Sequence, residues 1–107
     1  MSFEVYKDKA DEYRFRLKAS NGETVLSSEG YSAKTGVMNG IESVKENSKL
    51  DQRFESYTDK AGKYRFRLKA ANGQVIGSSE GYESEASCNA GIQSVRRWAE
   101  EAKIKEV

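Results

Sequence analysis

Apolar and polar residues alternate in two segments of the chain that carry the same six residues. In residues 13–18 (YRFRLK) aromatic or aliphatic side chains alternate with arginine or lysine, and residues 64–69 repeat the pattern. A period of two is that of a β-strand with one buried face and one solvated face. The pattern predicts two strands, the first of which directs Phe15 and Leu17 toward the core and Arg14 and Arg16 toward solvent.

An Asn-Gly pair follows each of these strands, at positions 21–22 and 72–73. Asn-Gly is typical of two-residue type I′ hairpin loops because both residues accept a positive φ angle. A two-residue loop fixes the register of the hairpin, so it also fixes which charged residues face each other. The predicted pairs are Arg14 with Glu29 and Arg65 with Glu80.

A second hairpin loop precedes each strand. In the second copy Lys60-Ala61-Gly62 suits a three-residue loop with glycine in the left-handed region, and Asp11 takes the place of that glycine in the first copy. The loop length sets the partners of the two opening strands. The predicted partners are Phe3 with Leu17, Glu4 with Arg16, Tyr6 with Arg14, Phe54 with Leu68, Glu55 with Arg67 and Tyr57 with Arg65.

The apolar period lengthens to that of a helix after each Gly-Tyr pair, with Ser32 suited to the N-cap of the first helix. Gly40 and Gly91 lie at equivalent positions in mid-helix, where glycine costs up to about 1 kcal/mol relative to alanine. We interpret them as points of close packing between helix and sheet. The predicted apolar stripes are Ala33, Val37, Ile41 and Val44 in the first helix and Ser84, Cys88, Ile92, Val95 and Ala99 in the second.

These elements recur because the chain is an internal duplication. Residues 3–44 align without a gap to residues 54–95, and more than half of the aligned residues are identical. About fifty residues bury too little surface to fold well alone, so we expect one domain, 1–107, made of repeat one (1–50) and repeat two (51–107). The predicted fold class is α+β: tandem βββα(β) repeats share one antiparallel sheet, with two helices on one face and approximate two-fold symmetry.

Charge and composition narrow the range of functions. Charged residues make up 33% of the chain but the net charge is only +1, whereas a domain built around a polyanion carries a clear basic excess. Cys88 is the one cysteine, which excludes a disulfide within the chain and fits a reducing compartment. The N-terminus lacks the pattern of a signal peptide, and no apolar run has the length of a membrane span. We expect a cytoplasmic protein without membrane or nucleic-acid partners.

Three repeated blocks carry a likeness to a known family. Tyr-Arg-Phe-Arg-Leu-Lys-Ala-x-Asn-Gly, Ser-Ser-Glu-Gly-Tyr and Gly-Ile-x-Ser-Val each occur twice, and with them the chain resembles the YegP-like family of small bacterial proteins over nearly its whole length. The resemblance implies no assigned activity. It implies units of three strands, a helix and a further strand, with the last strands exchanged between units. Lys103–Val107 would follow the second helix, and Arg53–Tyr57 would either close repeat one or open repeat two.

The basic residues of the strands form one candidate ligand-binding face. Arginines interleaved with aromatics are typical of platforms for single-stranded nucleic acid. The period of two argues against this function because it sends Tyr13 and Phe15 to the opposite face, and the predicted glutamates leave one unmatched positive charge per repeat. Tyr6 and Tyr57 keep the alternative open because they share the charged face. The candidate face comprises Tyr6, Arg14, Arg16, Lys18, Tyr57, Arg65, Arg67 and Lys69.

The sequence contains no recognisable catalytic or metal-binding pattern. Without histidine, triads and most general acid-base arrangements are missing. Cys88 lies on the apolar stripe of a helix, which favours a small core residue over a nucleophile. One cysteine and scattered carboxylates do not make a metal site, and Asn21-Gly22 lacks the spacing of a phosphate-binding loop. We predict no catalytic residue, no metal and no cofactor.

Arg96-Arg97-Trp98 interrupts the similarity of the repeats, because repeat one has Lys45-Glu46-Asn47 there. Trp98 lies near the apolar stripe of the second helix, so its first interpretation is a cap over the edge of the core. The alternative is a partner contact, since Trp and Arg are enriched at the centres of protein interfaces.

These observations favour a non-enzymatic interaction or structural module. We expect a monomer with internal pseudo-dimer symmetry. Its expected partner is a protein, which the sequence does not identify. An anion-binding or single-stranded nucleic-acid-binding module is the alternative. An enzyme is the third and weakest interpretation.

Overall fold

The computed structural model describes all residues, 1–107, as seven strands and two helices joined by short loops. Two single turns of 3-10 helix, Asp51–Arg53 and Ala99–Glu101, follow the two α-helices. In chain order the elements are β1 (Ser2–Lys7), β2 (Tyr13–Lys18), β3 (Thr24–Ser27), α1 (Lys34–Asn47), β4 (Phe54–Thr58), β5 (Tyr64–Lys69), β6 (Val75–Ser78), α2 (Glu85–Trp98) and β7 (Lys103–Glu106).

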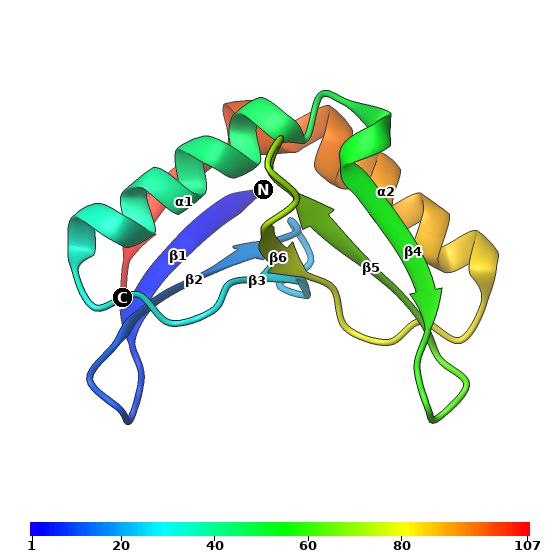
Figure 1. The fold of residues 1–107 in the computed structure, drawn as a ribbon, viewed down its shortest axis with the longest axis horizontal. Helices are drawn as coiled ribbons and strands as arrows, with labels where there is room; N and C mark the ends of the chain where they lie inside the picture. Colours follow the sequence, from blue (N-terminus) through cyan, green and yellow to red (C-terminus); the bar gives the residue numbers. More distant parts are fainter.

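All seven strands belong to one sheet in the order β4-β5-β6-β3-β2-β1-β7. The repeats meet at its centre, where Ser27 of β3 pairs with Ser78 of β6. Figure 1 shows the two helices on one side of the curved sheet, with the β1–β2 and β4–β5 loops projecting from its two ends. The predicted α+β class and its tandem repeats are confirmed. The sheet is mixed rather than wholly antiparallel, because β7 runs parallel to β1.

One apolar core serves both repeats. Phe15 and Leu17 of β2 and Phe66 and Leu68 of β5 have no exposed surface, as the alternation of these strands predicts. Their burial places the arginines between them on the opposite face of the sheet. The other members of the core are Phe3, Val5, Val25, Leu26, Val37, Ile41, Val44, Cys88, Ile92, Val95, Ala99 and Ala102.

The β1–β2 and β4–β5 hairpins have the predicted register. Glu4 faces Arg16 and Tyr6 faces Arg14 in repeat one, and the equivalent pairs recur in repeat two. Asp11 adopts a left-handed φ of 68°, matching the φ of 82° at Gly62. Aspartate tolerates this region better than most residues, so the three-residue loop survives the substitution.

The β2–β3 turn differs from the predicted type I′ loop. Ala19 N donates to Glu23 O and Gly22 N to Ala19 O, which closes a three-residue loop in which Gly22, at φ 86°, is left-handed and Asn21 is not. A bulge after Leu17 absorbs the additional loop residue, so Leu17 still faces Leu26. This geometry is that of a type I turn followed by a glycine bulge, which Asn-Gly also suits.

The predicted pairs Arg14 with Glu29 and Arg65 with Glu80 are wrong. Ser28 N donates to Phe15 O and Phe15 N to Ser28 Oγ, so a side chain replaces a backbone acceptor at this point. The segment after Ser28 then contains one residue more than the strand it faces, because the next pair is Tyr13 with Tyr31. Glu29 is therefore displaced from the position opposite Arg14. In repeat two, Ser79 takes the place of Ser28, and Glu80 is displaced from Arg65 in the same way.

The first helix begins one residue later than predicted. Ala33, not Ser32, is the N-cap of α1 and offers no side-chain bond, whereas Ser84 of α2 accepts a bond from Ser87 N at 3.1 Å. The mid-helix glycines leave room for tyrosine rings. A Cβ on Gly40 would lie 2.5 Å from Tyr31 Oη, and one on Gly91 would meet Tyr82 in the same way.

The two equivalent strands β1 and β4 are covered unequally. Residues 53–57 open repeat two, because β4 pairs antiparallel with β5. After α2, β7 crosses to repeat one and covers the outer side of β1. Only one segment lies between α1 and β5, and it becomes β4 itself. The outer side of β4, which we call the open edge, therefore carries no covering strand.

Candidate functional site

The candidate basic face begins with an arginine held by the neighbouring loop. Asp8 Oδ1 accepts bonds from Ala10 N and Glu12 N, and this leaves Oδ2 for Arg14 Nε at 2.5 Å. Arg14 Nη1 also donates to Ser28 O at 3.3 Å. Asp8 therefore takes the role that the sequence predicted for Glu29.

Repeat two builds the same arrangement. Asp59 Oδ1 accepts two hydrogen bonds from backbone N–H groups of the loop, and its Oδ2 lies 2.6 Å from Arg65 Nε. Arg65 Nη1 donates to Ser79 O at 3.3 Å. Recurrence in both copies indicates that this arginine stabilises the hairpin loop. The sequence contained the signal, since an Asp stands at the same place before each loop.

The other basic residues of the face share a glutamate on the opening strand. Glu4 Oε1 lies 2.8 Å from Arg16 Nε and 3.8 Å from Lys18 Nζ. In repeat two, Glu55 lies 3.3 Å from Arg67 Nε and 3.0 Å from Lys69 Nζ. These pairs follow the predicted register of the opening strands.

The two tyrosines of the face stack on arginine. The guanidinium carbon of Arg16 lies 4.4 Å from the centre of the Tyr6 ring, and that of Arg67 lies 4.0 Å from the centre of the Tyr57 ring. A ring that already stacks on a cation has that side occupied. One side of each ring is thus not available to stack on a nucleic-acid base.

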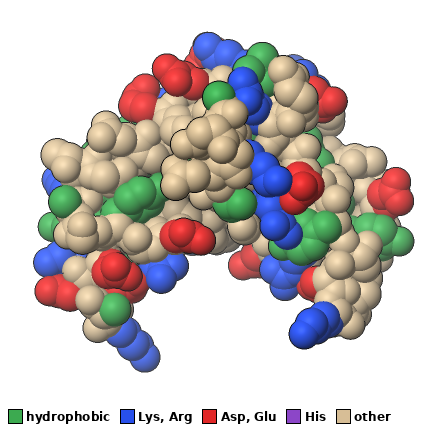
Figure 2. All heavy atoms as spheres, in the orientation of Figure 1, with side chains coloured by type: hydrophobic (Ala, Val, Ile, Leu, Met, Phe, Trp, Pro, Cys, Tyr) green, Lys and Arg blue, Asp and Glu red, His purple; other side chains and the backbone are tan.

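Ion pairing largely neutralises the face. Bonds to Arg14, Arg65, Arg16 and Lys69 hold the pKa of Asp8, Asp59, Glu4 and Glu55 below their usual values, so these carboxylates are charged at neutral pH. In each repeat, three basic groups share two carboxylates. Figure 2 shows the same intermixing of acidic and basic side chains on the visible side of the molecule.

Arg96, Arg97 and Trp98 end α2 without converging on one site. Arg96 Nη1 lies 3.4 Å from Asp51 Oδ1, across the junction of the repeats. Trp98 is 45% exposed, and the Arg97 guanidinium carbon lies 4.9 Å from the centre of one of its rings. The indole lines a surface hollow with Met1, Ala19, Ser20 and Ser94, and both interpretations of Trp98, a cap over the edge of the core and a partner contact, stay predictions.

Cys88 lies on the buried side of α2, with 2% of its surface exposed. Burial, and secondarily the charge of Glu85, raises the pKa of its thiol. A raised pKa disfavours the thiolate, which is the nucleophilic form of cysteine. The environment is that of a core residue.

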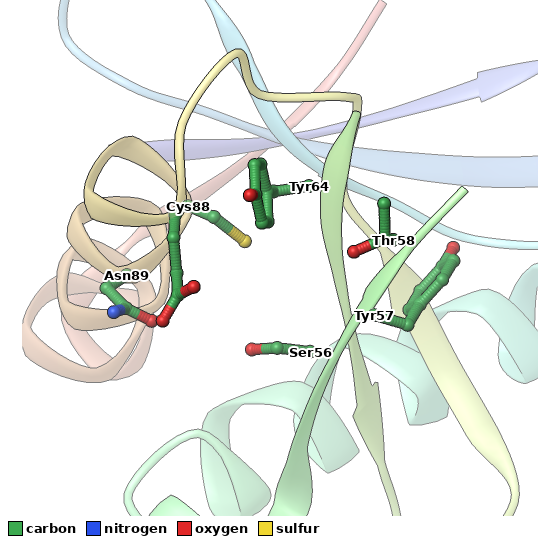
Figure 3. A pocket seen from close by; sticks show the side chains of 7 residues that line it. Ser56, Tyr57, Thr58, Tyr64, Cys88 and Asn89 are labelled. Carbon is green, nitrogen blue, oxygen red and sulfur yellow. The ribbon is translucent and has the colours of Figure 1, made fainter. Parts of the chain in front are cut away.

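A hollow of about 270 Å³ lies beside the open edge, between β4 and the start of α2. Figure 3 shows Cys88 and Asn89 of α2, Tyr64 of β5 and Ser56 of β4 around it, with the Tyr57 side chain directed the other way. The sequence-based reasoning missed this place. The lining residues are Ser56, Tyr57, Thr58, Tyr64, Glu85, Cys88 and Asn89.

Differences between the repeats could have revealed the hollow. Repeat one has apolar residues at three of the lining positions and repeat two has small or polar ones, and a charge of the opposite sign stands at a fourth. In the aligned sequence these pairs are Val5 with Ser56, Lys34 with Glu85, Val37 with Cys88 and Met38 with Asn89, and a fifth changed pair is Lys7 with Thr58.

Two kinds of site have no support in the fold. The structure brings no three His, Cys, Asp or Glu side chains together in a group able to hold a metal ion. Neither α1 nor α2 has the length and apolar character that a membrane crossing requires.

Comparison with known proteins agrees with the duplication. A family model described as a domain of unknown function, DUF1508, matches twice, at residues 8–55 and 59–106. A UPF0339 protein of the ptx operon 5′ region of Stutzerimonas stutzeri is 54% identical over 106 residues, which span 99% of this chain and 96% of that protein. YegP of Escherichia coli K12 is 49% identical over 94 residues, 88% of this chain and 86% of its own.

Two solution NMR structures have the same fold. The UPF0339 protein of Shewanella oneidensis superposes with a TM-score of 0.92 at 45% identity, over 98% of this chain and 89% of its own. YegP of Escherichia coli gives a TM-score of 0.92 at 45% identity, over 98% and 90%. The chain therefore belongs to the YegP-like UPF0339 family and carries two copies of its domain of unknown function.

Proposed function

We propose that this protein is a non-enzymatic interaction module that binds an extended segment of a partner protein along the open edge of β4. The function of the family is unknown, so the proposal rests on the molecule itself. The observation that carries it is the inequality of two equivalent strands: β1 has a covering strand, β7, and β4 has none.

The backbone of β1 shows what β4 offers. Val107 N donates to Val5 O at 3.0 Å, so Val5 directs its backbone groups outward to the covering segment while its neighbours pair with β2. Backbone direction alternates along a strand, as it does for side chains. By equivalence with Val5, the outward groups of β4 belong to Phe54, Ser56 and Thr58. An unpaired row of such groups is a template for another strand.

The same observations weigh against catalysis. The chain has no histidine, and its cysteine is buried with a raised pKa. The carboxylates with lowered pKa values are bonded to arginine or lysine. Such groups hold the fold together and are poor proton carriers near neutral pH.

The alternative function, an anion-binding or single-stranded nucleic-acid-binding face, has less support because its basic groups are ion-paired. Binding of single-stranded DNA or RNA in a gel shift tests it directly. Binding that weakens steeply with salt and disappears in the Arg14→Ala, Arg65→Ala double variant would favour the alternative.

We further propose that the protein is a monomer with internal pseudo-dimer symmetry and acts in the cytoplasm. The ion pairs of the charged sheet face recur in both repeats, and the shared core already joins the repeats. The free thiol of Cys88 suits a reducing compartment.

Site-specific photocrosslinking in the native cell tests the open edge. A photoreactive residue at Thr58 should capture a partner, and Ser56→Pro should abolish that capture because it removes an outward N–H without touching the β5 ladder. A photoreactive residue at Lys7, the equivalent position of β1, is the matched control. Capture at Thr58 that persists in a folded Ser56→Pro protein would overturn strand addition.

A further inference from the structure

We propose that the occupant of the open edge is a basic extended segment running parallel to β4, with an apolar residue between lysines or arginines. This inference rests on the proposed function and specifies the partner's chemistry. Its template is the way in which β7 covers β1, because β1 and β4 are equivalent strands of the two repeats.

The register of β7 on β1 assigns a role to each of its residues. Ile104 lies opposite Phe3, Lys105 opposite Glu4 and Glu106 opposite Val5. In a parallel pair, residues that lie opposite each other direct their side chains to the same face. Ile104 therefore covers the core beside Phe3, and Lys105 lies on the charged face.

Two differences in exposure show what is missing from β4. Phe3 is fully buried, whereas Phe54 remains partly exposed. The side chain of Glu4 is 19% exposed and has Lys105 among the charges that lower its pKa, whereas that of Glu55 is 47% exposed. A segment with an apolar residue opposite Phe54 and a lysine opposite Glu55 would supply both contacts.

The third contact that β7 makes is an ion pair, and its helix partner has the opposite charge in repeat two. Glu106 of β7 forms an ion pair with Lys34 at the start of α1. The residue of α2 equivalent to Lys34 is Glu85, which is exposed and forms no ion pair. The occupant therefore needs a lysine or arginine opposite Ser56, where β7 has Glu106. A long cationic side chain there would enter the hollow lined by Ser56, Glu85 and Asn89.

This reversal also argues against a second copy of the chain as the occupant. In the β1 register, the β7 strand of another molecule would bring Glu106 against Glu85, and like charges in contact disfavour binding. One residue thereby disfavours the binding of the chain's own C-terminal strand at the open edge. The same residue gives the edge its preference for a basic segment.

Two synthetic peptides test the inference, one containing Lys-Ile-Lys-Lys-Val and the other Lys-Ile-Lys-Glu-Val as in β7. Titration into the 15N-labelled protein should shift the amides of β4 and the start of α2, with the Lys-Lys peptide binding about fivefold or more tightly. Glu85→Lys should invert the preference. Glu42→Lys, the same charge change on the exposed side of α1, should leave it unchanged.

The outcomes separate the two proposals. If neither peptide shifts the β4 amides at millimolar concentration, strand addition itself is overturned. If both bind equally and Glu85→Lys changes nothing, the function stands and the charge preference is wrong. A spin label at the peptide N-terminus should broaden the Phe54 end of β4, and broadening at the Thr58 end would overturn the parallel orientation.

Discussion

Repeat one carries Leu26 where repeat two carries Gly77, and the two residues meet where the repeats join. A Cβ on Gly77 would lie 2.7 Å from Leu26 Cγ and Cδ2. Two copies of the same leucine cannot occupy this space. The difference shows that the two copies of a duplicated unit need different residues at their junction, where equivalent side chains would otherwise collide.

The outer ends of the sheet differ for another reason. The C-terminus of repeat two continues into β7 and covers β1, whereas the segment after α1 has to become the next strand. Position 5 is a buried valine and the equivalent position 56 an exposed serine. Sequence and exposure have diverged together, as expected if β1 is covered by β7 while the equivalent strand β4 faces a different environment.

Separating the repeats should have the largest effect. Fragments 1–50 and 51–107 each lose a large part of the shared core, so neither should show a cooperative thermal transition as a monomer. Circular dichroism with analytical ultracentrifugation checks this. A stable monomeric half, or two distinct transitions in the intact chain, would contradict a single domain.

Gly77→Leu should be the most damaging single substitution at the junction. Overpacking against Leu26 should lower the free energy of unfolding by about 3 kcal/mol, measured by urea denaturation. The swap of both residues, Leu26→Gly with Gly77→Leu, should recover much of the loss. A neutral Gly77→Leu would show that the junction is not tightly packed.

The mid-helix glycines should be nearly as sensitive. Leucine at Gly40 or Gly91 would collide with the ring of Tyr31 or Tyr82, at a cost of about 1 to 3 kcal/mol. Similar losses in the two repeats are expected because the contacts match. A stabilising substitution, as helix propensity alone would give, would remove the packing explanation.

The helix N-caps offer a smaller test in the opposite direction. Ala33→Ser should give α1 the cap that Ser84 gives α2 and raise stability by about 1 kcal/mol. Ser84→Ala is the matched variant and should lose a similar amount. No change in either would show that solvent satisfies these N–H groups equally well.

The acid limb of stability should report on the loop aspartates. The pKa values of Asp8 and Asp59 are lowered in the folded protein, so their contribution is present above the unfolded pKa, near 3.8, and is lost as pH falls below it. Asp8→Asn keeps the loop acceptor and removes the charge. The Asp8→Asn variant should show a shallower decline in melting temperature below pH 4 than the unmodified protein. An unchanged decline would mean that other carboxylates cause it.

Much of the fold could be predicted because its signals are local. The period of two placed Phe15 inside and Arg14 outside, and the loop at Asp11 set the register of Glu4 with Arg16. The loop at Asn21-Gly22 was harder, since the same pair suits two loop lengths. The loop length left the partner of Arg14 unchanged, because the bulge after Leu17 restores the register. That partner changed at Ser28, whose hydroxyl accepts a bond from Phe15 N, and where the chain gains one residue before Tyr31.

The sequence by itself determined the duplication, from its alignment with itself, and the three strands and helix of each repeat, from periodicity within a few residues; the last strand, β7, followed only from the family resemblance. Only the tertiary structure decided which carboxylate binds Arg14, why position 77 is glycine, and which edge stays open. Each of these depends on residues far apart in the chain. The open edge of β4 exists because a single segment after α1 cannot both form that strand and cover it.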